Sequence, residues 1–252
     1  MKFVININKP VGMTPLEAIH AFKEKNPHYR GKKMSYPGRL DPMAEGALIL
    51  LVDEENKKMT QYMKLDKEYE AEILFGIETD SHDILGMPRK NGPVEINERA
   101  LKKKIKSFVG DYDQEAPVYS SIRVKGKALL NYARRGTLEG LTIPKFTVTI
   151  KKIVIDGTYT ISAVRLLKEI IRKIDLVQGD FRQEMIKNAW RLLLENSEEK
   201  YAAAKIIVSC TSGMYIRALA RDVGKDFGGG MLMSLKRTRV GKYYIRESER
   251  LR

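Results

Sequence analysis

The chain has 252 residues, 43% of them hydrophobic, and a formal net charge of +14, which indicates a globular protein and excludes a disordered one. No apolar run approaches the roughly 20 residues of a membrane helix, and the N-terminus lacks the features of a signal peptide. The single cysteine, Cys210, excludes an intramolecular disulfide, so a reducing, cytoplasmic setting is expected.

The first hundred residues predict strands and two capped helices. Thr14-Pro15-Leu16-Glu17 has the form of a capping box with proline at the first helical position, and Asn97 is placed to cap a second helix. Alternating or continuous apolar residues indicate the strands. The expected strands are residues 3–8, 47–52 and 69–75, and the expected loops are residues 26–38 and 76–92, the second of them polar.

The rest of the chain predicts more strands and helices, without an internal repeat or a low-complexity linker. The expected helices are residues 128–135, 161–174, 181–195 and 213–227, and the expected strands are residues 146–155, 206–209 and 240–245. Because helices and strands do not follow a regular βαβ rhythm, we expect an α+β fold with a mixed sheet. Nothing marks a domain boundary, so residues 1–252 are expected to form a single domain.

The excess positive charge is confined to two blocks of the sequence. Residues 101–152 carry a net charge of +8 and residues 205–252 carry +7, whereas residues 1–100 carry −1 and residues 153–204 are neutral. Such clusters favour a polyanion as partner, because each neutralised phosphate releases counterions. A basic protein without such a partner is the alternative. An anionic membrane surface fits less well, since neither block forms a long basic amphipathic helix.

The usual signatures of a cofactor or metal site are missing. Cys210 has no histidine in a supporting motif, so a small buried strand residue is the expected role. One cysteine and three scattered histidines do not make a zinc site. Gly228-Gly229-Gly230 lacks the Lys-Ser/Thr of a phosphate loop and is expected to be a turn. We expect neither a metal nor a nucleotide cofactor.

Three separated segments join a polar or aromatic side chain to a basic neighbourhood. They are Arg39-Leu40-Asp41-Pro42, Lys67-Glu68-Tyr69 and Cys210 to Arg217. Asp-Pro alone commonly starts a turn, Tyr69 alone suits a half-buried strand, and Arg217 alone suits the surface. However, Arg217 is expected in the first turn of a helix, where a cation opposes the macrodipole and needs compensation such as a carboxylate.

Together with Asn8-Lys9-Pro10-Val11-Gly12-Met13-Thr14, these segments resemble the TruB-type tRNA pseudouridine synthases. The resemblance runs from residue 5 to about 155 and from 205 to about 244. Its motifs are Gly-Arg-Leu-Asp-Pro-x-Ala-x-Gly-x-Leu, Lys-Glu-Tyr, the segments 118–127 and 132–136, and Tyr215-Ile216-Arg217. It implies a pseudouridine-synthase catalytic domain with a mainly antiparallel central sheet flanked by helices and loops.

The resemblance also implies a reaction and the residues for it. Asp41 matches the essential aspartate, which acts on a uridine flipped out of its stack. The N1–C1′ bond breaks, the uracil rotates, and it rejoins through C5 without a cofactor. Tyr69 matches the tyrosine that stacks on the uracil and is proposed to help remove the C5 proton, and Arg217 matches the arginine that pairs with the aspartate. Residues expected to line or brace the pocket are Tyr215, Lys9 and Leu235.

The implied substrate is the T-loop uridine of tRNA, at position 55 by tRNA convention. The two basic blocks would then follow phosphates along the T-arm. The candidates in the first block are Arg123, Lys125, Lys127, Arg134 and Arg135, and those in the second are Lys236, Arg237, Arg239 and Lys242.

Three features depart from the family pattern. Tyr36 stands where the family usually has a histidine, five residues before the aspartate, which inserts into the T-loop. Residues 156–204 are expected to insert a neutral helical hairpin that packs on the body or on a partner. The chain ends without the C-terminal RNA-binding (PUA) domain of many relatives, so weaker tRNA binding is expected. The expected apolar faces of the hairpin are Val164, Leu167 and Ile171, and Met185, Ala189 and Leu193.

Two other functions are compatible with parts of this pattern. A synthase acting on another RNA, such as ribosomal RNA, would share the Arg-Leu-Asp segment, but not the Asp-Pro-x-Ala-x-Gly continuation together with the Asn-Lys-Pro opening. A non-catalytic RNA-binding or RNA-folding protein would need the basic blocks but not Asp41, Tyr69 and Arg217. We therefore expect an enzyme, acting as a monomer.

Overall fold

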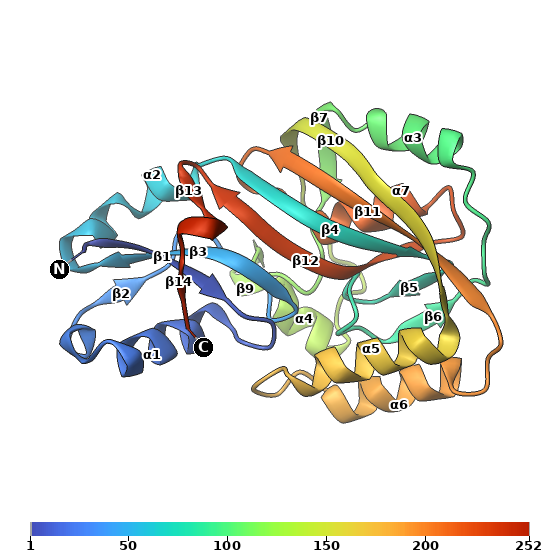
Figure 1. The fold of residues 1–252 in the computed structure, drawn as a ribbon, viewed down its shortest axis with the longest axis horizontal. Helices are drawn as coiled ribbons and strands as arrows, with labels where there is room; N and C mark the ends of the chain where they lie inside the picture. The colour runs from blue at the N-terminus through green and yellow to red at the C-terminus, as the bar shows by residue number, and fades with distance from the viewer. Residues whose placement is uncertain (1, 252) are drawn as a thin grey trace.

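The computed structural model describes residues 2–251, and its centre is a ten-stranded sheet (Figure 1). Eight strands follow one another in the order β14-β1-β3-β12-β4-β11-β10-β7, while β2 pairs with β3 and β13 pairs with β12. The strands of the sheet are β1 (Val4–Lys9), β2 (Met34–Ser35), β3 (Ala44–Val52), β4 (Lys67–Phe75), β7 (Gly110–Glu115), β10 (Lys145–Ser162), β11 (Lys200–Cys210), β12 (Gly230–Val240), β13 (Tyr243–Tyr244) and β14 (Glu249–Arg250).

Most neighbouring strands of the sheet are antiparallel. Only the pairs β1–β14 and β12–β3 are parallel among the described residues. The β12–β3 pair joins the N-terminal part of the sheet to the part built from β4, β11, β10 and β7. The expected mixed, mainly antiparallel sheet of an α+β fold is confirmed.

Helices and two small hairpins surround this sheet. The helices are α1 (Pro15–Lys25), α2 (Met59–Met63), α3 (Glu98–Lys106), α4 (Leu129–Arg135), α5 (Ala163–Asp175), α6 (Gln183–Leu194) and α7 (Ile216–Gly224), with 3-10 turns at Pro27–Tyr29, Asp53–Lys58 and Ile245–Glu247. The small hairpins pair β5 (Ile77–Thr79) with β6 (Pro88–Lys90) and β8 (Arg123–Val124) with β9 (Lys127–Ala128). No helix within residues 2–251 has the length and apolar character to cross a membrane.

The predicted helix caps are present. The Glu17 amide donates to Thr14 Oγ1 at 3.2 Å and the Thr14 amide donates to Glu17 Oε2 at 2.6 Å, which completes the capping box of α1. Asn97 Oδ1 accepts from the Ala100 amide at 3.0 Å and caps α3. These signals are local, so the sequence alone locates both helix starts.

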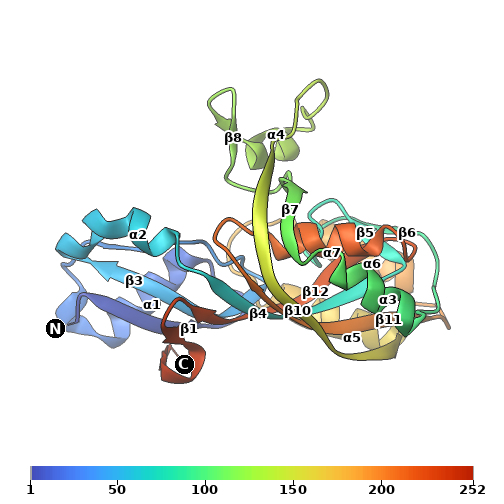
Figure 2. The ribbon, with the colours of Figure 1, turned by 90° about the horizontal axis from the view of Figure 1, so that it is seen from above.

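The two faces of the sheet carry different helices. Ile73 and Phe75 of β4 pack in a core with α3 and α7, whereas Leu74 packs in a second core with α5 and α6. Figure 1 shows α5 and α6 as an antiparallel pair below the sheet, and α3 at its upper edge. The segment between β7 and β10, residues 116–144 (the arm), stands away from the sheet in Figure 2.

The helical insertion differs from its prediction in extent. β10 continues to Ser162 and β11 begins at Lys200, and the two strands pair along these extensions, so the ends of the segment 156–204 are strand. The predicted apolar faces are only partly right, because Leu167 and Leu193 pack against the core but Val164 is 64% exposed and Met185 is 52% exposed. The buried positions are Leu166, Ile170 and Ile174 of α5, and Ile186, Trp190 and Leu194 of α6. Both helices carry apolar residues on more than one face, and packing against the sheet determines which face is buried.

Two further predictions need correction, and one strand was missed. The final strand, expected at 240–245, is the end of β12 (Gly230–Val240) together with the short β13 (Tyr243–Tyr244), and most of β12 was not predicted because its basic residues hid its strand pattern. β7, with the polar sequence Gly-Asp-Tyr-Asp-Gln-Glu, was not predicted. The expected polar loop 76–92 contains the β5–β6 hairpin and buries Ile77, Ile84 and Leu85 against α6 and its neighbours.

Candidate active site

Asp41 lies in the loop that leads into β3, the buried strand at the centre of the N-terminal part of the sheet. Its carbonyl accepts from the Ala44 amide at 2.9 Å, which closes a turn just before the strand begins. Further along, Gly46 adopts a φ of +114°, and a Cβ there would lie 2.3 Å from the Arg237 carbonyl oxygen. The loop is thus fixed between β3 and β12, with the Asp41 side chain 35% exposed.

Arg217 is the second residue of α7 and directs its guanidinium into this loop. Its Nε donates to Asp41 Oδ2 at 2.7 Å, so residues 176 positions apart form the ion pair that the sequence predicted. Nη1 donates to the Ser81 carbonyl at 2.8 Å and Nη2 to the Tyr119 carbonyl at 3.1 Å. Because the Arg217 side chain is only 6% exposed, these acceptors provide the compensation that a buried cation in a first helical turn requires.

Asp83 is a member of this cluster that the sequence analysis missed. Its Oδ2 lies 3.7 Å from Arg217 Nε, and its Oδ1 accepts from Ser81 Oγ at 2.6 Å and from the Leu85 amide at 2.9 Å. Burial raises the pKa of its carboxyl group, and the Arg217 charge opposes that rise. The signal in the sequence was an aspartate directly before the apolar pair Ile84-Leu85 in a segment taken to be polar.

Tyr69 lies on β4, on the face of the sheet that α7 covers. It is 7% exposed, and its neighbours across the sheet are Val208 of β11 and Arg237 of β12. Burial raises the pKa of its phenol to about 12, and the negative charge of Asp41 adds to the effect. The phenol is therefore neutral at physiological pH.

Two other residues predicted for the pocket lie next to α7 or in the core of Tyr69. Tyr215 directly precedes α7, and its amide donates to Gln114 Oε1 at 3.0 Å, while Leu235 packs against the same core as Tyr69. Burial raises the pKa of the Tyr215 phenol, with a contribution from Asp41. Tyr36 is partly buried and packs against the core formed by α1, β1 and β3.

Lys9 is fully buried at the end of β1. Its Nζ donates to the carbonyls of Pro10 at 2.9 Å and Met13 at 2.7 Å, and it thereby holds the turn of the Asn-Lys-Pro motif. Burial lowers its pKa to about 7, although the charges of Asp41 and Glu45 act in the opposite direction. Lys9 therefore braces the loop beside Asp41 through its hydrogen bonds.

The basic side chains of the two blocks differ in their exposure and contacts. The first lies on the arm, and all five of its candidates are exposed: Arg123, Lys125, Lys127, Arg134 and Arg135. The arm projects from the body in Figure 2, where such side chains are accessible to a large ligand. An arm of this shape with exposed cations suits contact with phosphates.

The second block does not form a comparable surface. Arg237 is 2% exposed and donates to the carbonyls of Ala47 at 2.8 Å and Arg39 at 2.9 Å, so its assignment as a phosphate contact is wrong. Lys236 pairs with Glu70 at 3.3 Å, on the face of the sheet opposite Tyr69.

The other two candidates of the second block also contact neighbouring side chains. Arg239 lies 3.8 Å from Glu68, its neighbour across the sheet, and Lys242 lies over the Tyr243 ring at 5.7 Å. The Glu residues of β4 thus offset the charge of β12. Within residues 2–251, no cluster of three or more His, Cys, Asp and Glu side chains is arranged to hold a metal ion.

Comparison with known proteins identifies relatives of this chain. Residues 26–166 match the family described as TruB family pseudouridylate synthase (N terminal domain). A protein named tRNA pseudouridine synthase B from Caldanaerobacter subterraneus is 31% identical over 97% of this chain and 71% of its own length. One of the same name from Aromatoleum aromaticum is 30% identical over 97% of this chain and 65% of its own length.

Solved structures show the same fold at lower sequence identity. A chain of a Cbf5-Nop10-Gar1 complex superposes with a TM-score of 0.58 at 19% identity, covering 96% of this chain and 49% of that one. A chain of an H/ACA RNP bound to a substrate RNA containing 2′-deoxyuridine gives a TM-score of 0.57 at 18% identity, covering 98% and 50%. The present chain spans 57% to 71% of the length of its curated relatives.

Proposed function

This chain belongs to the TruB family of pseudouridine synthases, and on that premise we propose that it converts the T-loop uridine of tRNA, at position 55, to pseudouridine. The observation that carries the proposal is the ion pair between Asp41 and Arg217, with Tyr69 in the core that α7 covers. The names of the relatives support tRNA as the substrate. The product is an isomer of the substrate, so the reaction needs neither an oxidant nor an energy source.

The geometry supports Asp41 as the catalytic group. Arg217 holds Oδ2 of the carboxylate, and the side chain remains 35% exposed, so the carboxylate is both oriented and accessible to a flipped nucleotide. Asp83 and two carbonyls also contact Arg217 from the protein side, which keeps the arginine in place when substrate enters. The reaction breaks the N1–C1′ bond, forms a C5–C1′ bond, and moves one proton from C5 to N1.

Tyr69 is proposed to support the flipped uracil by stacking. Aromatic faces are common platforms for an unstacked base. With a pKa raised to about 12, the phenol is a poor proton acceptor at neutral pH in the free protein. Its neutrality favours the stacking role over that of a general base.

The arm is proposed to bind the tRNA backbone. If its cations contact phosphates, Arg123→Gln combined with Lys127→Gln weakens T-arm binding by about tenfold at moderate salt and reduces the salt dependence of Kd. The matched control is Lys236→Gln combined with Arg239→Gln. It removes the same amount of charge from the face of the sheet opposite Tyr69, and it should leave Kd within about twofold of the wild-type value. Equal losses in the two double variants would contradict the proposed role of the arm.

The catalytic proposal is tested by tritium release from a [5-³H]uridine-labelled T-arm stem-loop. Asp41→Asn keeps the size of the side chain but removes its charge, so we expect it to abolish release while RNA binding persists. Asp226→Asn, which alters an exposed carboxylate paired with Lys104, is the control and retains full activity. If the wild-type protein releases no tritium, the catalytic proposal is wrong, and if release maps to ribosomal RNA fragments instead, the substrate is wrong.

A further inference from the structure

The turn between α5 and α6, residues 176–182, contacts the loops around Asp41 instead of standing free. The Gln178 amide donates to the Gly12 carbonyl at 2.9 Å, and the Gly12 amide donates to the Pro42 carbonyl at 2.8 Å. On the other side, Arg134 Nη2 of the arm donates to the Asp180 carbonyl at 3.2 Å. The helical insertion thereby links the loop after β1 to the arm.

Arg182 makes the most extensive of these contacts. Its Nη1 donates to Asp80 Oδ2 at 3.2 Å, and its guanidinium lies over the Tyr119 ring, 4.7 Å from the ring centroid. The Tyr119 hydroxyl donates to the same Asp80 oxygen at 3.0 Å. Arginine, aspartate and tyrosine therefore form a closed triangle that joins the insertion, the β5–β6 loop and the arm.

This triangle lies directly behind the acceptors that hold Arg217. Asp80 precedes Ser81, whose carbonyl accepts from Arg217 Nη1, and Tyr119 itself supplies the carbonyl that accepts from Nη2. The side chains of Asp80 and Tyr119 thus fix the two peptide groups that orient the arginine. Arg217 in turn orients the Asp41 carboxylate.

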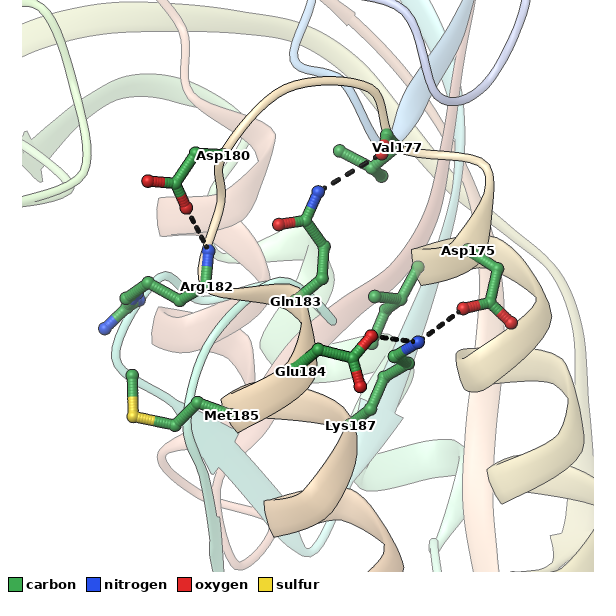
Figure 3. A pocket seen from close by; sticks show the side chains of 9 residues that line it. Asp175, Val177, Asp180, Arg182, Gln183, Glu184, Met185 and Lys187 are labelled. Carbon is green, nitrogen blue, oxygen red and sulfur yellow. Dashed lines mark hydrogen bonds and ion pairs between the residues drawn. The ribbon is translucent and has the colours of Figure 1, made fainter.

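The backbone at Arg182 gives a second reason to assign its side chain a purpose. Arg182 adopts a φ of +64°, a left-handed conformation that is strained for a residue with a Cβ and that glycine adopts freely. An arginine at a position that suits glycine is explained when its guanidinium binds a specific partner. In Figure 3 the Arg182 side chain points away from the hairpin turn, on the side opposite Lys187, which reaches Asp175 and Glu184.

We propose that Arg182 is a positioning residue for the catalytic aspartate, acting through the Asp80–Tyr119 pair and Arg217; the inference rests on the proposed function of Asp41. Arg182 and Asp80 are 26% and 35% exposed, so their ion pair contributes little to stability. Its loss should leave the protein folded. The effect on turnover is expected to be larger, because a small displacement of a catalytic group costs far more in rate than in stability.

The test compares three variants with the wild type. Arg182→Gly removes the guanidinium and relaxes the backbone, Arg182→Lys keeps the charge, and Lys187→Ala removes two ion pairs of the same hairpin that do not reach the active site. Hydrogen exchange of segments 79–87 and 117–122 measures how firmly the loops are held. The Met87 amide, which donates to Asp80 Oδ1 at 2.8 Å, reports on Asp80 directly.

For Arg182→Gly we expect faster exchange in both segments, a kcat about tenfold lower and a KM within about twofold of wild type. Arg182→Lys recovers part of the kcat, and Lys187→Ala changes neither quantity. Unchanged exchange in Arg182→Gly, an effect confined to KM, or an equal effect in Lys187→Ala would overturn the inference. A wild-type protein without activity would refute the proposed function, and exchange would still decide whether Arg182 holds these loops.

Discussion

Trp190 tests whether the helical insertion is part of the protein core. It is the only tryptophan of the chain, it is fully buried on α6, and its Nε1 donates to the Ile84 carbonyl at 3.2 Å. Trp190→Ala removes the largest side chain of this core and leaves that carbonyl unpaired, so we expect a loss of about 4 to 6 kcal/mol in the free energy of unfolding. Trp190→Phe retains most of the volume and should cost about 1 to 2 kcal/mol.

The assay is urea denaturation followed by circular dichroism, with Trp190 fluorescence as a second probe in the wild type. If the insertion folds with the body, both probes give the same midpoint. Leu192→Ala on the same helix, at a position 91% exposed, is the control and should change stability by less than about 0.5 kcal/mol. A fluorescence midpoint below the circular-dichroism midpoint, or a Trp190→Ala cost near that of the control, would refute the integration of the insertion into the core.

Two further predictions concern the loop that precedes α1. Burial lowers the pKa of Lys9 from 10.5 to about 7, so the unfolded chain binds more protons between these values and stability rises with pH across that window. Relative to Lys9→Met, the wild type should gain up to about 1.4 kcal/mol per pH unit between pH 7 and 9 in urea titrations, whereas a constant difference would contradict the lowered pKa. Gly12 has a φ of +97°, and a Cβ there would lie 2.1 Å from the Leu176 carbonyl oxygen, while Gly38 has a φ of +98° and open space. Gly12→Ala should therefore lower the free energy of unfolding by about 3 kcal/mol or more, and Gly38→Ala by only about 1 kcal/mol. Equal losses would show that the hairpin turn does not pack closely against this loop.

Much of the fold and part of the site were predictable because their signals are local. The capping residues Thr14 and Asn97 lie within three residues of the groups they bind, and the apolar run that became β3 is continuous in the sequence. The motifs around Asp41, Tyr69 and Arg217 each occupy a short segment, so family resemblance singled out all three. Arg217 was also expected to need a carboxylate, from the direction of the helix dipole alone.

Other features depend on which segments meet, and only the tertiary structure decided them. β12 carries basic residues on both faces, and its register against β4 buries Arg237 beside Tyr69 while it places Lys236 opposite Glu70. The helices of the insertion have apolar residues in more than one register, and contact with the sheet selected the face that contains Trp190.

The support of the active site is likewise assembled from distant segments. Asp83 and Arg182 lie in parts of the sequence with no motif, and their ion-pair partners, Arg217 and Asp80, are more than a hundred positions away. Periodicity and capping describe how a segment interacts with itself and with solvent. The identity of a buried ion pair depends on long-range pairing of strands and loops, so the sequence singled out Asp41 and Arg217 while the fold determined what holds the arginine.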